Sequence, residues 1–162
     1  MTLDREALAD NRKVKGWLLW YAERKRECEQ RRDSILYASP GPPDGMPRGT
    51  EVSDPTGRKG AKLGDLETDL AWICLVEEVE SKLPPKMQIF LRLRREAEYT
   101  KTRLRGRPGW VAYVQDHYAK EMAKANNKRP SDYWVEDRTF FAWWDRIVTY
   151  AVIRAAKRGI LG

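Results

Sequence analysis

The sequence predicts an all-α protein in which an N-terminal helical arm precedes a multi-helix domain that ends in a helix-turn-helix. Apolar residues recur at helical spacing along the long stretches of the chain, and prolines and glycines gather between those stretches. At 162 residues the chain fits one domain, or one domain with an arm, and can bury roughly two thirds of its unfolded surface. We divide it into a helical arm (1–37), a Pro/Gly-rich loop (38–54), a central helix (55–83) and a basic helix-turn-helix part (84–162).

The arm is expected to form one long, charged helix over residues 3–37. Apolar side chains recur every seven residues at Val14, Tyr21, Cys28 and Ile35. The positions that would complete a coiled-coil seam hold charged residues instead, so a strong zipper is not predicted. The stripe fits a helix packed on the core of its own chain. Weak pairing with a second copy, as in a homodimer, is the alternative.

The central helix begins after the Pro/Gly-rich loop. Asp54 can cap a helix, and Pro55 loses no hydrogen bond at the first helical position. Glutamates at 77, 78 and 80 are expected to be solvated near the end of this helix. Its predicted buried stripe consists of Leu63, Leu66, Leu70 and Ile73.

Two further helices are expected between the Pro84-Pro85 pair and the last helix. A run of seven basic residues extends from Arg92 in the first of these helices to Arg107, and such a run suits contact with phosphates or a solvated linker. The second begins at Pro108, and His117 lies near the edge of its apolar face, where a structural role is expected. That face is formed by Trp110, Val111, Val114, Tyr118, Met122 and Ala125.

The last helix is predicted over residues 136–158, after a polar turn at 126–135. Asp137 can cap its first amides, and Gly159 can take the left-handed conformation that closes a helix. One face is apolar and the opposite face is basic and hydroxylated. The apolar face consists of Phe140, Trp144, Ile147, Val148, Ala151 and Ala155, and the other of Arg138, Thr139, Ala142, Arg146, Thr149 and Lys157.

Positive charge is concentrated in the last third of the chain. Residues 101–162 contain 13 Lys or Arg against 6 Asp or Glu, an excess equal to the net charge of +7 of the whole chain. This favours a polyanionic partner, although an uneven surface with no such role is the alternative.

Several classes of function are disfavoured by composition. Cys28 and Cys74 lie among helical apolar positions and are expected to be buried thiols, with a disulfide the minor alternative. His117 is the only histidine, so a zinc site and a histidine-based triad are not expected. No nucleophile motif, metal-ligand spacing or phosphate-binding glycine loop occurs, so we predict no enzyme, cofactor or metal. The chain shows no signal-peptide core or membrane span, which predicts a soluble intracellular protein.

Two stretches resemble a known family. The segment DGMPRGTEVSDPTGRKGAKL (44–63) is similar to the signature of the RinA/ArpU-type phage late-gene regulators. The residues LPP at 83–85 and FLRLR at 90–94 resemble the opening of the sigma-70 region-4-like helix-turn-helix of that family, and RTF at 138–140 resembles the start of its second motif helix. The resemblance covers about residues 21–159 and implies a DNA-binding transcriptional regulator of phage late or packaging genes. Such a regulator is expected in the cytoplasm of the bacterial host cell, associated with the nucleoid.

On this interpretation the helix 136–158 lies in the major groove of double-stranded DNA. Arg138 and Arg146 would contact guanines, and Thr139 and Thr149 bases or phosphates, while Ala142 would permit close approach. Contacts to phosphates are expected from Lys101, Arg103, Arg105, Arg107 and Lys157.

Host RNA polymerase is a further expected partner of such a regulator. A small terminase-like DNA-packaging subunit, which would form a large ring, is the first alternative function. The second is an adaptor that binds RNA polymerase through residues 1–60 and uses its charge only for solubility.

Overall fold

The computed structural model describes the backbone of residues 2–37, 55–100 and 109–161, with side chains from residue 4 and, after the first gap, from residue 63. Over these ranges the chain is all-helical, as predicted, and contains no strand. The elements are α1 (Thr2–Leu19), α2 (Tyr21–Leu36), α3 (Pro55–Lys82), α4 (Pro85–Thr100), α5 (Gly109–Asn126), the 3-10 helix η1 (Pro130–Tyr133) and α6 (Asp137–Lys157).

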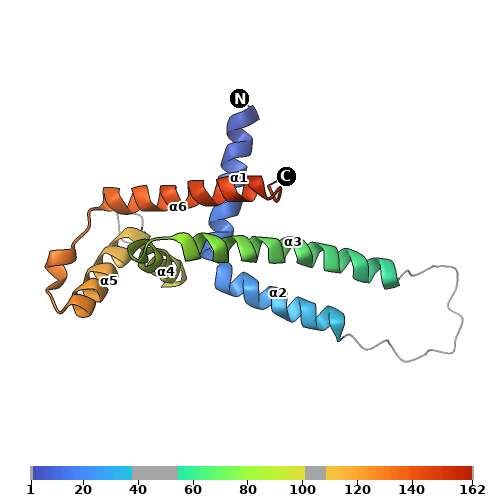
Figure 1. Ribbon diagram of the computed structural model, residues 1–162, viewed down its shortest axis with the longest axis horizontal. Coiled ribbons are helices and arrows are strands. Elements are labelled where there is room, and N and C mark those ends of the chain that lie inside the picture. Colours follow the sequence, from blue (N-terminus) through green and yellow to red (C-terminus); the bar gives the residue numbers. More distant parts are fainter. Residues whose placement is uncertain (1, 38–54, 101–108, 162) are drawn as a thin grey trace, which may run out of the picture.

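The longest helix, α3, is the centre of the arrangement. Helix α2 lies along one side of α3 and α6 along the opposite side, while α1 crosses these helices steeply (Figure 1). Helices α4 and α5 pack against each other near the C-terminal end of α3. Helix α6 therefore forms one outer edge of the molecule.

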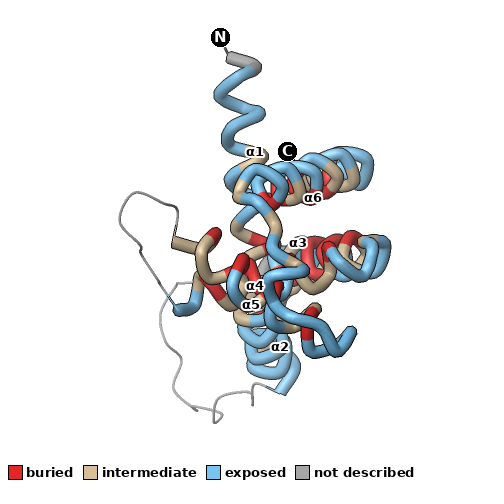
Figure 2. Tube along the Cα trace, turned by 90° about the vertical axis from the view of Figure 1, so that its left-hand side faces the viewer, coloured by how far each residue is buried: buried red, intermediate tan, exposed pale blue. Residues whose placement is uncertain are grey.

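The predicted single helix over 3–37 is wrong, because the chain turns at Trp20 and forms two helices. Trp17 stacks on Trp72 of α3, with ring centroids 5.8 Å apart, and Leu18 is fully buried. Beyond the turn, Cys28 is buried along α2. The break at Trp20 allows the apolar residues of both helices to be buried. The first half of α1 instead projects from the body as an exposed segment (Figure 2).

The hydrophobic core draws side chains from all six α-helices. The predicted stripe of α3 is confirmed, with Leu66 and Ile73 buried and Leu63 and Leu70 partly buried against the core. At the centre of an aromatic cluster, Phe90 of α4 stacks on Phe140 of α6 with ring centroids 5.4 Å apart. This contact ties α6 to the same core as α4.

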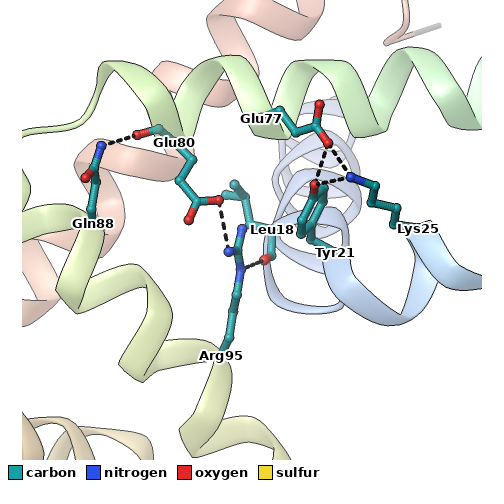
Figure 3. A network of polar contacts seen from close by, with 7 residues as sticks. All are labelled: Leu18, Tyr21, Lys25, Glu77, Glu80, Gln88 and Arg95. Atoms are coloured by element: carbon teal, nitrogen blue, oxygen red, sulfur yellow. Dashed lines mark hydrogen bonds and ion pairs between the residues drawn. The ribbon is translucent and has the colours of Figure 1, made fainter.

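Glutamates of α3 hold the neighbouring helices, although the sequence suggested that they were merely solvated. Figure 3 shows Tyr21 and Lys25 of α2 donating hydrogen bonds to Glu77, at 2.5 and 2.9 Å. In the same view Arg95 of α4 donates to the carbonyl of Leu18 at 2.7 Å and to Glu80 at 3.0 Å. Glu77 thus joins α3 to α2, and Glu80 joins α3 to α4. The acidic end of α3 therefore binds two neighbouring helices through polar contacts.

The two cysteines differ from the expectation that both are buried. Cys28 is buried, but Cys74 is exposed on α3, and neither forms a disulfide. His117, expected to be structural, stacks on Tyr113 with ring centroids 3.9 Å apart, and its Nδ1 lies 2.9 Å from the Tyr113 carbonyl oxygen.

Candidate nucleic-acid interface

Helix α6 has the two faces that its sequence predicts. All six residues of the predicted apolar face are buried. They meet α1, α3, α4 and α5, so one side of the helix is covered along its length. The helix closes at Gly159 in the left-handed conformation, with φ of 70°, as predicted. Burial of this stripe fixes which side of α6 faces outward.

The structure brings the predicted base-contact residues together on that outward side. Every one of them is exposed, and so is Lys157 near the end of the helix. Asp145 and Ile153 are also exposed there, and the sequence interpretation did not include them. We call the six exposed residues Arg138, Thr139, Ala142, Arg146, Thr149 and Lys157 the outer face of α6.

The basic residues of α6 fall into two groups. Arg154 and Arg158 point back toward α3, and both pair with Glu78. The cations of the outer face make no ion pair or hydrogen bond with any described residue. Within the described ranges the Glu78 carboxylate thus neutralises only the inward arginines, and the three outward cations have no internal counter-ion there.

The start of α6 differs from the prediction that Asp137 caps the helix. Asp137 is its first helical residue, while the capping position belongs to Glu136, whose side chain makes no capping hydrogen bond. The carboxylate of Asp137 instead accepts a hydrogen bond from Gln115 of α5. Gln115 also donates to the carbonyl of Val135 at 3.1 Å. The buried Gln115 thus holds the first turn of α6. Helical periodicity could not have predicted this role, because it depends on a contact between two helices.

Beside this first turn lies a hollow of about 300 Å³. Trp134, three residues before the first residue of the helix, lines it and is 57% exposed. Gln115 also lines it, and its side-chain oxygen is buried and accepts no hydrogen bond within the described ranges. The remaining lining residues are Glu136, Asp137 and Arg138.

Helices α5 and α6 occur in the order that a helix-turn-helix requires, but they pack chiefly on different neighbours. Helix α5 lies mainly against α4 and η1, and α6 mainly against α1 and α3. The connection between them is long enough to contain η1 and the left-handed Asn127, with φ of 53°. This length lets α6 align with α3 and leaves its outer face uncovered by α5.

The basic run from Arg92 to Arg107, which begins within α4, is only partly described. Lys101, Arg103, Arg105 and Arg107, the predicted phosphate contacts, lie outside the described residues. The three arginines that begin the run serve the fold. Arg92 pairs with Glu121 of α5, Arg95 binds Leu18 and Glu80, and Arg94 is buried between Trp110 and Trp144. Burial lowers the pKa of Arg94.

Two further features bear on the kind of site. No group of three or more His, Cys, Asp or Glu side chains that could hold a metal ion is found in the described part of the chain. Among the described helices, none has the length and apolar character needed to cross a membrane. Comparisons with family models, curated proteins and solved structures found no match.

Proposed function

We propose that this chain binds double-stranded DNA through the outer face of α6, and that it regulates transcription from a phage promoter. The observation that carries the proposal is the division of the helix into a buried apolar face and an exposed face whose three cations pair with no residue that the structure describes. The resemblance of residues 44–63 to the RinA/ArpU-type regulators supplies the biological context of late or packaging genes.

The chemistry of the outer face suits the major groove. An α-helix fits that groove, and a guanidinium can donate two hydrogen bonds to the O6 and N7 atoms of guanine. Arg138 and Arg146 take this role, and Thr139 and Thr149 contact bases or phosphates. Ala142 lies between them with a short side chain, so bases can approach the helix backbone.

Phosphate contacts would come from Lys157 and from the basic residues 101–107. Each neutralised phosphate releases counterions, so the affinity should fall steeply as salt is raised. Base contacts and phosphate contacts can therefore be told apart by their dependence on sequence and on salt.

The test is a salt-titrated binding experiment with fragments of phage genomic DNA. Arg146→Ala should weaken binding to the preferred fragment by about 1–3 kcal/mol and relax its sequence preference. Arg26→Ala is the matched control, because it removes from α2 an exposed arginine that forms no ion pair with another described residue. Helix α2 lies on the far side of α3 from α6 (Figure 1). Arg26→Ala should change binding far less.

Uniform weak binding to every fragment, unaffected by Arg146→Ala, would contradict the proposal. Light scattering on the same sample distinguishes the packaging alternative, because a terminase-like subunit forms a large ring, whereas a promoter regulator is expected as a monomer or dimer.

A further inference from the structure

One carboxylate stands among the basic and hydroxylated residues on the outward side of α6. Asp145 is exposed near the middle of the helix. The positions three and four residues away, where helical neighbours meet, hold Phe141, Ala142, Val148 and Thr149, and none of these is basic. The Asp145 carboxylate forms no ion pair or hydrogen bond with any other described residue.

Other carboxylates of the chain do have a basic neighbour on their own helix. Asp116 pairs with Lys120 at 2.8 Å and Glu96 with Arg92 at 3.3 Å, in both cases four residues apart. On a DNA-binding face, an unpaired carboxylate repels the phosphates, because like charges meet. It therefore weakens binding to any DNA unless it accepts a hydrogen bond from a base.

The groups in the major groove limit which base can meet this carboxylate. An ionised aspartate only accepts hydrogen bonds, and the amino groups of cytosine and adenine are the donors that the bases present in that groove. Adenine also presents the acceptor N7 beside its amino group, whereas cytosine presents its N4 amino group alone. Guanine and thymine present acceptors there, which a carboxylate repels. Cytosine is therefore the base that suits Asp145.

We propose that Asp145 contacts a cytosine in the major groove and thereby rejects the other bases at one position of the site. This inference depends on the proposed DNA-binding function and adds a specificity-determining residue to it. Asp145 follows Arg138 by seven residues on the same edge of the helix, which separates them by about 10.5 Å along its axis. Successive base pairs are about 3.4 Å apart, so the cytosine should lie about two to three base pairs from the guanine that Arg138 contacts.

The test uses the full chain and the DNA fragment that it retains, with each base pair replaced in turn by the other three. For the parent, replacing the cytosine should weaken binding about 5- to 150-fold, the range that corresponds to one mismatched base pair. Asp145→Asn should remove most of this loss at that position and leave the other positions unchanged, because an amide both donates and accepts hydrogen bonds. The same variant should bind random-sequence DNA more tightly than the parent, since one negative charge near the phosphates is removed.

Asp65→Asn is the matched control, because it removes the same charge from an exposed aspartate that forms no ion pair with another described residue. Asp65 lines a hollow together with Arg31 and Ser34 of α2, and α2 lies on the opposite side of α3 from α6 (Figure 1). Asp65→Asn should leave every base preference unchanged.

Three results would overturn the inference. The first is a profile in which no position of the site requires cytosine, and the second is an Asp145→Asn variant with the parent's profile. The third is an equal gain of both variants on all DNA without a change at any single position, which would show that the carboxylate acts only through its charge.

Failure of this inference is distinguishable from failure of the proposed function. If Arg146→Ala weakens specific binding while Asp145→Asn leaves every base preference as it was, α6 binds DNA and Asp145 does not contact a base. If neither substitution has an effect and binding is uniform, the DNA-binding function itself is wrong.

Discussion

One buried polar side chain, that of Gln115, holds the start of α6 in place. Gln115 is 2% exposed, and its amide group spans the connection before α6 by binding the Val135 carbonyl and the Asp137 carboxylate. Both partners precede the outer face by only a few residues. Loss of these two hydrogen bonds would therefore move the residues of α6 that we assign to DNA contact.

Gln115→Leu should lower the free energy of unfolding by about 1–3 kcal/mol, because the Val135 carbonyl loses a donor that water cannot easily replace. Denaturant unfolding measures this difference. Gln30→Leu, at an exposed position on α2, is the control and should change stability far less. Equal effects of the two substitutions would show that Gln115 does not hold the start of α6.

Whole helices are joined by carboxylates of α3. The pKa of Glu77 is lowered, first by the hydrogen bond from Tyr21 and then by the bond from Lys25. Burial is the main reason that the pKa of Tyr21 is raised, so its hydroxyl keeps the donated proton. The α2–α3 pair is therefore linked by an ionised carboxylate at neutral pH.

This linkage predicts an acid-sensitive contribution to stability. A carboxylate whose pKa is depressed in the folded protein stabilises it fully above the ordinary value of 4.5, and the contribution is lost as the pH falls through the lower folded value. Unfolding free energies measured from pH 7 to pH 3 should therefore fall less steeply for Glu77→Gln than for the parent. Glu67→Gln, an exposed position on the same helix, should follow the parent.

At the scale of the whole molecule, α1 contacts α2, α3, α4 and α6 where it crosses them. Leu18 is fully buried at this crossing, and its carbonyl accepts the hydrogen bond from Arg95 of α4. Earlier in the same helix, Leu8 is 64% exposed on the projecting segment. The two ends of α1 thus contribute differently to the fold.

Leu18→Ala should cost about 2–5 kcal/mol of unfolding free energy, because it removes buried methyl groups and leaves a cavity. Leu8→Ala makes the same chemical change at an exposed position and should stay within about 0.5 kcal/mol of the parent. Thermal or denaturant unfolding of the pair measures the difference. Similar losses for both would mean that the projecting half of α1 is covered in solution.

Sequence periodicity was enough to predict the helices after residue 54 and the buried faces of α3 and α6, but not the division of the first 37 residues into two helices. The stripe of α6 from Phe140 to Ala155 is one example, and the left-handed end at Gly159 is another. Such features depend on spacing within one helix and on the backbone freedom of glycine, which are local properties. The exposure of the candidate DNA-binding residues follows from them, since the side opposite a buried stripe faces outward.

Contacts between distant segments required the tertiary structure. The stacking of Trp17 on Trp72 beside the turn at Trp20, the pairing of Glu78 with Arg154 and Arg158, and the hydrogen bond from Gln115 to Asp137 all join residues far apart in the chain. Whether a charged side chain is solvated or paired depends on what lies opposite it after folding, and helical spacing carries no information about that. The sequence by itself therefore determined the helical class and the two faces of α6, whereas only the tertiary structure decided which of its cations remain available and how its first turn is held.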